Sequence, residues 1–365
     1  MDELTRSDAS LPQAEPALTA GAPPPTIKRF FIGDDGLRAG WSLAIFMLLA
    51  FALIAAGNAG LRLSHLVPPP TKHVAGEPAA LMTPRLSLLT EVTGFTAFAL
   101  AALLMSLIER RPFRRYGLTT KRFVPDLVTG SFWGIASLSA LVGVLLLTHH
   151  LAFDQTLLHG QAVAIAGLKW AAVFFFVGLF EEFATRGYIQ YTVSRGVAGI
   201  ARAMNPTFRH THAVGFWVSA LIFSVLIFMA GHLGNRGETL PGILAVGIAG
   251  AVFAFSLWRT GSLWWAIGFH TTWDWAQSFL YGVPDSGTMA ANRLELTHPA
   301  GVDWLSGGPA GPEGSVFVVP TLLAVAAVIY FTLPRRSYFL TPDQRPQQDD
   351  PALAAEDSVV ARSSI

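Results

Sequence analysis

Residues 168–191 read LKWAAVFFFVGLFEEFATRGYIQY, an apolar run of the length that crosses a lipid bilayer but one that contains two glutamates and an arginine. An ionisable side chain at the centre of a membrane helix costs roughly 2.5 to 3.5 kcal/mol to insert, so such residues are paired or functional. Glu182 and Arg186 stand four residues apart on one helical face and are predicted to form an ion pair. Glu181 points about 100° away around the helix and is free to face a cavity, where a carboxylate suits proton exchange.

The whole chain has the composition of a membrane protein. Of its 365 residues 52% are hydrophobic and only 13% are charged, and the apolar residues gather into runs of spanning length. The sequence therefore predicts an all-α, polytopic helical membrane protein with about eight transmembrane helices and with the buried polar residues inside the bundle. The predicted spans cover residues 39–61, 86–108, 127–147, 168–191, 213–233, 239–258, 262–281 and 315–333.

The regions outside the spans define the predicted domain organisation. Residues 1–36 are rich in proline and small polar residues, and residues 341–365 have low hydrophobicity, so we predict that both are disordered cytoplasmic tails. Residues 37–340 form the predicted transmembrane domain. Most of the 25 lysines and arginines fall on the segments that an even number of spans places on one side, which predicts cytoplasmic termini by the positive-inside rule. The expected location is the inner (plasma) membrane of a bacterium, crossed several times.

Two further predicted spans carry polar groups at helical spacing. The first is Phe228-Met-Ala-Gly-His232, in which the small Ala230 and Gly231 are predicted to allow another helix to approach beside the imidazole. The second is His270-Thr-Thr-Trp-Asp274, where the imidazole and the carboxylate share one face and can orient each other. His232 and His270 are the two of the ten histidines that lie inside the apolar runs.

Glu181 and His232 can come close together only if they lie at the same depth in the membrane, and this depends on where the fourth span begins. We expect this span to start near Leu168, with Lys169 at the outer boundary, so that Glu181 lies near mid-depth together with His232. A start at Gln161 would place the glutamates near the cytoplasm, out of reach of His232.

The three motifs Glu181-Glu182-x-x-x-Arg186, Phe228-x-x-x-His232 and His270-x-x-x-Asp274 resemble, in order and in setting, those of the CAAX prenyl protease and Abi family of intramembrane proteases, the CPBP family. The likeness covers about residues 168–281, the predicted protease-like core. It implies that Glu181 and His232 activate the attacking water and that Glu182 and Arg186 hold the first motif helix. It also implies that His270 and Asp274 polarise the scissile carbonyl or stabilise the oxyanion.

The cofactor is left open by the sequence. The chain has no cysteine, so any metal site must use His, Asp or Glu. Glu181, His232 and His270 could hold a zinc ion with one open coordination position, or the glutamate could activate water without a metal. This sequence has Asp274 where the family commonly has Asn, and the added negative charge favours cation binding. Long insertions around residues 201–212 and 282–314 also depart from the family pattern.

The predicted function is hydrolysis of a membrane-associated peptide or protein tail by an intramembrane endopeptidase, a CAAX-type metalloendopeptidase or a glutamate-dependent peptidase. The alternatives are a catalytically silent relative that acts as a scaffold or immunity protein, and a proton-coupled transporter, because buried Glu and His also build proton relays. Other intramembrane proteases are excluded, since the sequence has no GxSG, HExxH or GxGD motif. The predicted partners are the peptide substrate and the lipid bilayer; nucleic acid is not expected, and the oligomeric state is not predicted.

Overall fold

The computed structural model describes residues 30–33, 36–67, 81–235 and 239–334. The chain divides into two units, Met1–Arg38 and Ala39–Ile365. In the first unit, strands β1 (Ile32–Gly33) and β2 (Gly36–Leu37) pair as an antiparallel hairpin. The predicted tail 341–365 lies outside the described residues, as does most of the predicted tail 1–36; the described part of the latter is this hairpin.

The second unit is all-α and belongs to a multi-pass membrane protein. Its apolar runs form helices because the backbone must satisfy its own hydrogen bonds in lipid. Six helical stretches in the described part of the chain are long and apolar enough to span a membrane. They are Ala39–Leu63 (α2), Pro84–Ile108 (α3), Phe123–Leu147 (α4), Gln161–Met204 (α5 and α6), Thr211–His232 (α7, η2 and α8) and Leu240–Thr260 (α9).

The last two of the eight predicted spans are also helical, but they are shorter. Helix α10 (Trp264–Trp275) continues into the π-helical segment η3 (Ala276–Leu280), and α12 has the bounds Val318–Thr332. All eight predicted transmembrane helices are thus helical, but among the described residues only six helical stretches have the length and composition to span a membrane.

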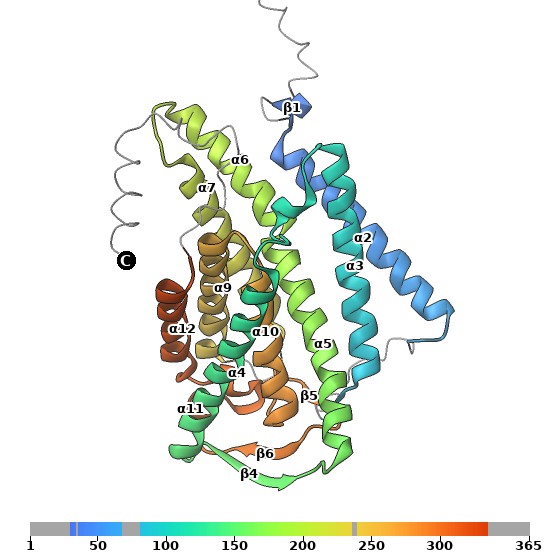
Figure 1. The fold of residues 1–365 in the computed structure, drawn as a ribbon, viewed down its shortest axis with the longest axis vertical. Helices are drawn as coiled ribbons and strands as arrows, with labels where there is room; N and C mark the ends of the chain where they lie inside the picture. The colour runs from blue at the N-terminus through green and yellow to red at the C-terminus, as the bar shows by residue number, and fades with distance from the viewer. Residues whose placement is uncertain (1–29, 34–35, 68–80, 236–238, 335–365) are drawn as a thin grey trace, which may run out of the picture. The chain divides into compact units, whose positions relative to one another are not determined.

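Glycines allow α10 to pack directly against the backbone of α4 in the middle of the bundle (Figure 1). A Cβ atom added to Gly130 of α4 would lie 2.1 Å from the Trp265 carbonyl oxygen, and one added to Gly134 would lie 2.3 Å from that of Phe269. Gly268 of α10 makes the reciprocal approach to the Leu127 oxygen, at 2.3 Å. Small residues at such crossings are the usual means of close helix association in membranes, and here they fix the helix that carries His270 and Asp274.

The fourth span does not begin where the sequence predicted. Helix α5 (Gln161–Arg186) starts directly after Gly160, and Lys169 is an exposed residue within it, because a long cationic side chain on a helix surface does not end the helix. Helix α6 (Tyr188–Met204) follows after a break at Gly187, where a Cβ would lie 2.4 Å from the Phe183 carbonyl oxygen. The glutamates thus lie in the last turns of α5, just before this break.

The fifth span is composite. Helix α7 (Thr211–Ser219) leads into a π-helical segment, η2 (Ala220–Ile227), and then into α8 (Phe228–His232). π-Helical turns are rare and often occur at functional sites. Here one such segment directly precedes the second motif, and η3 directly follows the third.

Helix α9 crosses η2 at Gly250 so closely that a Cβ atom at this position would lie 1.5 Å from the carbonyl oxygen of Ser224. We predict that Gly250→Ala destabilises the fold by about 1 to 3 kcal/mol, because backbone must move to relieve the overlap. Gly143→Ala in α4 is the matched control, since nothing lies within 4 Å of its added Cβ. Thermal unfolding in detergent measures both variants, and equal midpoints would contradict the close crossing.

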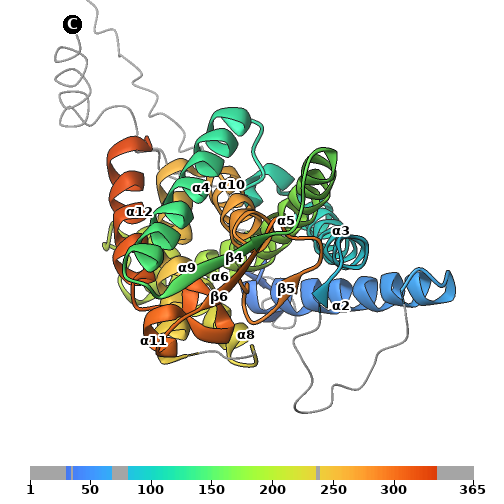
Figure 2. The same ribbon diagram turned by 90° about the horizontal axis from the view of Figure 1, so that it is seen from below.

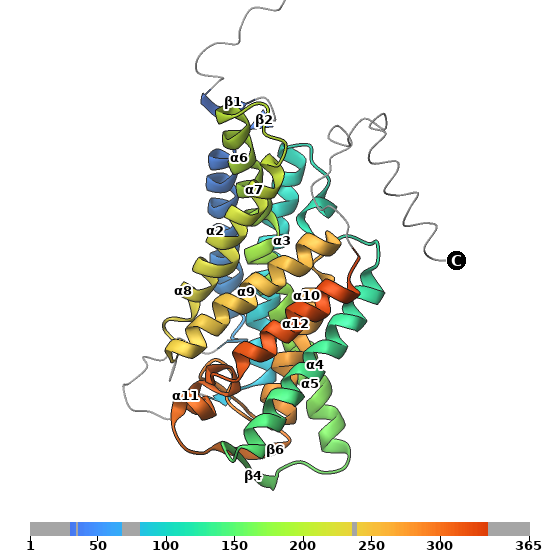
Figure 3. The ribbon, with the colours of Figure 1, turned by 90° about the vertical axis from the view of Figure 1, so that its left-hand side faces the viewer.

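The segment from residue 282 to residue 314 folds back over one end of the bundle (Figure 2). Its strand β6 (Glu295–Pro299) pairs antiparallel with β4 (Leu151–Thr156), and β5 (Met289–Ala290) pairs parallel with β3 (Leu81–Met82). After the short helix α11 (Asp303–Ser306) the chain enters α12, which packs beside α9 (Figure 3). The segment 282–314 thereby brings residues of the predicted outer loop next to the motif helices.

Candidate active site

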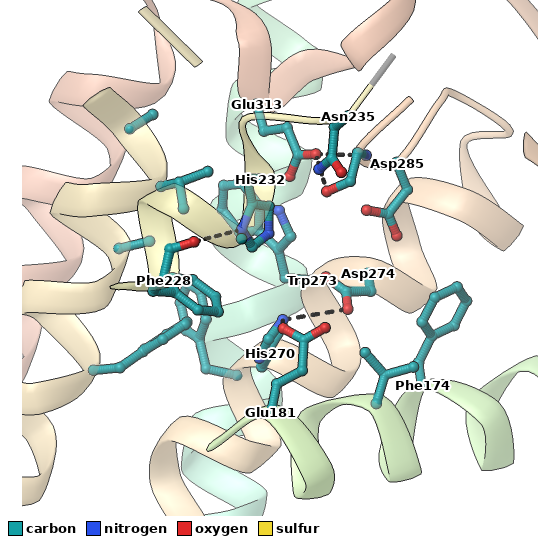
Figure 4. A pocket seen from close by; sticks show the side chains of 18 of the residues that line it. Phe174, Glu181, Phe228, His232, Asn235, His270, Trp273, Asp274, Asp285 and Glu313 are labelled. Atoms are coloured by element: carbon teal, nitrogen blue, oxygen red, sulfur yellow. Dashed lines mark hydrogen bonds and ion pairs between the residues drawn. The ribbon is translucent and has the colours of Figure 1, made fainter. Parts of the chain in front are cut away.

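A cavity of about 360 Å³ opens between the motif helices and is lined by residues of all three motifs. Glu181 comes from α5, His232 from α8, and His270 and Asp274 from α10, and their side chains surround the same space (Figure 4). The expectation that a fourth span starting at Gln161 would separate Glu181 from His232 was therefore wrong. Glu182 and Arg186 do not line the cavity and lie buried behind it.

Glu182 and Arg186 form the predicted ion pair at the base of the site. Arg186 Nη1 donates to Glu182 Oε1 at 2.7 Å, and both side chains are fully buried. The guanidinium also lies over the rings of Phe228 and Phe253, 5.1 and 5.2 Å from their centroids. Cation–π contacts of this kind stabilise a desolvated arginine. The pair therefore connects the first motif to the helix that bears His232.

His270 is surrounded by three carboxylates. Its Nδ1 atom lies 3.2 Å from Glu182 Oε1, while its Nε2 atom lies 3.5 Å from Asp274 Oδ2 and 3.8 Å from Glu181 Oε2. Because the carboxylate of Glu182 is already paired with an arginine, it accepts the hydrogen bond and Nδ1 carries the proton. The ring also stacks on Phe253 at 5.6 Å. These contacts hold Nε2 toward the carboxylates of the cavity.

Glu181 is the most exposed carboxylate of the motifs. Its side chain retains 36% of its exposure, compared with 9% for Asp274 and none for Glu182. Neighbouring residues on the same helix therefore have opposite environments, as the helical geometry predicted. Glu181 is the motif glutamate that a water molecule or a peptide in the cavity can reach.

His232 is oriented by its own helix. Its Nδ1 lies 2.8 Å from the Phe228 carbonyl oxygen, and its ring packs edge-on against the Phe228 ring at 4.7 Å. A carbonyl oxygen can only accept, so Nδ1 carries the proton and Nε2 is left as an acceptor. The predicted close helix approach at Gly231 is not found: among the described residues nothing lies within 4 Å of its added Cβ, and the residue lines the cavity. The small side chain leaves space beside His232.

Residues 163–276 match the family described as type II CAAX prenyl endopeptidase Rce1-like. This segment is Rce1-like. It holds all six motif residues, and the predicted resemblance is confirmed. The match supports an intramembrane endopeptidase of the CAAX type in general. No curated protein and no solved structure matches the chain significantly.

Six polar residues outside the predicted set also line the cavity of the Rce1-like segment. They are Glu91 of α3, Asn235, and Asp285, Ser286, Thr288 and Glu313 of the 282–314 segment. Burial raises the pKa of Asp285, which the nearby Asp274 and Glu313 raise further, and burial also raises that of Glu313. The sequence offered a signal for Glu91, a lone carboxylate in an apolar run. It offered none for Asp285 and Glu313, which reach the site only through the fold of a long loop.

The predicted zinc ligands do not form a three-ligand set in this arrangement. Within the described residues, no group of three or more His, Asp or Glu side chains is placed to hold a metal ion. Glu181 Oε2 and His270 Nε2 are 3.8 Å apart, but His232 does not complete a cluster with them. The described side chains of the Rce1-like segment therefore do not fit a three-ligand metal site.

Proposed function

We propose that this protein is an intramembrane endopeptidase that cleaves a membrane-associated peptide or protein tail with a water molecule activated by Glu181 and His232. The observation that carries the proposal is the convergence of Glu181, His232, His270 and Asp274 on one cavity inside the Rce1-like segment. We also propose that it lies in a bacterial plasma membrane with both termini in the cytoplasm; the distribution of its lysines and arginines supports this orientation.

Water activation requires a proton acceptor that faces the cavity. The accessible carboxylate of Glu181 takes the proton of the attacking water, and the acceptor Nε2 of His232 orients that water by a second hydrogen bond. The proton held by Glu181 then passes to the leaving amine. Both groups thus act on the same water from two different helices.

The developing negative charge on the carbonyl oxygen needs a hydrogen-bond donor. His270 is held through Nδ1 by Glu182 and through its stack on Phe253, so its position does not have to change during the reaction. When protonated, the ring presents Nε2–H toward the cavity, with Asp274 at 3.5 Å to stabilise the cation. Glu182 and Arg186 position this ring and take no direct part in the chemistry.

A cleavage assay with the full-length protein in detergent and a fluorogenic lipidated peptide library tests the proposal. We expect His232→Ala to reduce the cleavage rate by about 100-fold, in the range for loss of one acid–base group. Glu295→Gln, at a β6 carboxylate that does not line the cavity, is the control and should cleave at the wild-type rate. Undiminished cleavage by folded His232→Ala would contradict the role of this imidazole.

The same assay with a chelator tests the metal. We expect cleavage to persist, because the described acidic and imidazole side chains do not form a three-ligand set. Loss of cleavage in the chelator, restored by zinc, would instead establish the metalloendopeptidase that the sequence left open. Absence of cleavage under every condition would favour the silent scaffold or the transporter.

A further inference from the structure

Three carboxylates outside the motifs face the proposed active-site cavity without a lysine or arginine partner among the described residues. They are Glu91 of α3, and Asp285 and Glu313 of the 282–314 segment. In the described part of the chain, no lysine or arginine lines this cavity, and none of the three carboxylates forms an ion pair with such a residue. The three belong to regions outside residues 163–276, so the family match assigns them no role.

Neutral groups hold two of these carboxylates in place. Asp285 Oδ2 accepts a hydrogen bond from Ser278 Oγ at 2.9 Å, and Glu313 Oε1 accepts from the backbone nitrogen and the hydroxyl of Ser286 at 2.6 and 2.9 Å. Such donors orient a carboxylate but do not cancel its charge. Glu91 lacks even these contacts: among the described residues it has no hydrogen bond and no ion pair. The fold therefore positions several carboxylates at a cavity whose described lining offers no lysine or arginine to neutralise them.

Burial makes this arrangement costly unless something else supplies a counter-charge. The pKa values of Asp285 and Glu313 are raised chiefly by burial, and among the described residues the opposing positive charge comes only from imidazoles, His270 for both and His232 for Glu313. A positive charge in the cavity would remove that cost. Much of the remaining lining is apolar and aromatic, including Phe174 and Trp273, and suits the hydrocarbon stem of a lysine or arginine.

We propose that the substrate carries a lysine or arginine next to the cleaved bond, that Asp285 and Glu313 bind its charged end, and that Glu91 adds negative charge to the same cavity. The three would then determine specificity, because a neutral side chain forfeits the ion pairs and an acidic one is repelled. This inference rests on the proposed function in one respect: it takes the molecule that occupies the cavity to be a peptide substrate.

Binding measured without cleavage tests the inference separately from catalysis. The Glu181→Gln variant, purified in detergent, is used so that the peptides are bound but not cleaved. The probes are fluorescein-labelled apolar peptides that differ only in a central lysine, glutamine or glutamate. We expect the lysine peptide to bind at least about tenfold more tightly than the glutamine peptide, and the glutamate peptide to bind most weakly. The variant Glu91→Gln/Asp285→Asn/Glu313→Gln should lose this order, whereas the control Glu295→Gln should keep it.

Equal affinity for the lysine and glutamine peptides would overturn the inference, and so would an unchanged preference in the triple variant. If the triple variant does not fold, each single substitution should lower the ratio of the two affinities by part of the full effect. The preference for lysine together with failure of wild-type protein to cleave any peptide would refute the proposed hydrolysis and leave the cation-binding cavity standing.

Discussion

Glu181→Gln should lower the cleavage rate by about 10²- to 10⁴-fold, the usual range for removal of a positioned general base. The amide retains the size and hydrogen-bonding shape of the carboxylate but cannot accept the proton of the attacking water. Because the Glu181 side chain is partly exposed to the cavity and forms no part of the buried pair beneath it, the variant should fold normally. Initial rates on the fluorogenic lipidated peptide measure the effect.

The control for this substitution is the same change at Glu295 in β6, where an amide can still accept the hydrogen bond from Thr156. Glu295→Gln should cleave at the wild-type rate. Peptide binding by Glu181→Gln should also persist, since the proposed loss lies in the chemical step. Cleavage by purified, folded Glu181→Gln at more than about a tenth of the wild-type rate would exclude this glutamate as the base.

Arg186→Met should destabilise the fold by about 3 to 5 kcal/mol, because removing one member of a buried ion pair leaves the other charge without its partner. The guanidinium and the Glu182 carboxylate are 2.7 Å apart and both are shielded from solvent. The two cation–π contacts with Phe228 and Phe253 would be lost as well. Unfolding in a detergent titration gives the free-energy change.

The double variant Glu182→Gln/Arg186→Met separates the charge from the packing. Removing both charges should recover much of the lost stability, because no unpaired carboxylate remains in the interior. Arg62→Met, at an exposed arginine in the last turn of α2, is the control and should leave stability within about 0.5 kcal/mol of the wild type. A double variant less stable than Arg186→Met would show that Glu182 is not held by this arginine.

The motif helices could be predicted from the sequence because an apolar run and an i, i+4 spacing are local properties. The opposite environments of Glu181 and Glu182 follow from the rotation of the helix alone, and so do the neighbouring positions of His270 and Asp274. The start of α5 was mispredicted because Lys169 was interpreted as a membrane boundary, although lysine is tolerated on the outer face of a continuing helix. The membrane depth of Glu181 inferred from Lys169 alone therefore did not predict correctly whether Glu181 and His232 share a cavity.

The remaining site residues depend on tertiary structure. Asp285 and Glu313 lie in a segment without helical or strand periodicity, and its pairing with β3 and β4 and its contacts with α9 bring them to the cavity. Glu91 lies near the start of its predicted span, residues 86–108. It lines the same cavity as Glu181, a relation between two helices that neither local sequence shows.

The open space at Gly231 gives experimental access to the interior of this protein. The chain contains no cysteine, so Gly231→Cys would introduce a single thiol on the wall of the cavity, at a position where an added Cβ meets nothing within 4 Å. The rate at which thiol reagents of increasing size modify it would measure the width of the entrance. A spin label or fluorophore attached there would report the arrival of a peptide beside His232, without any change to the groups that hold the reacting atoms.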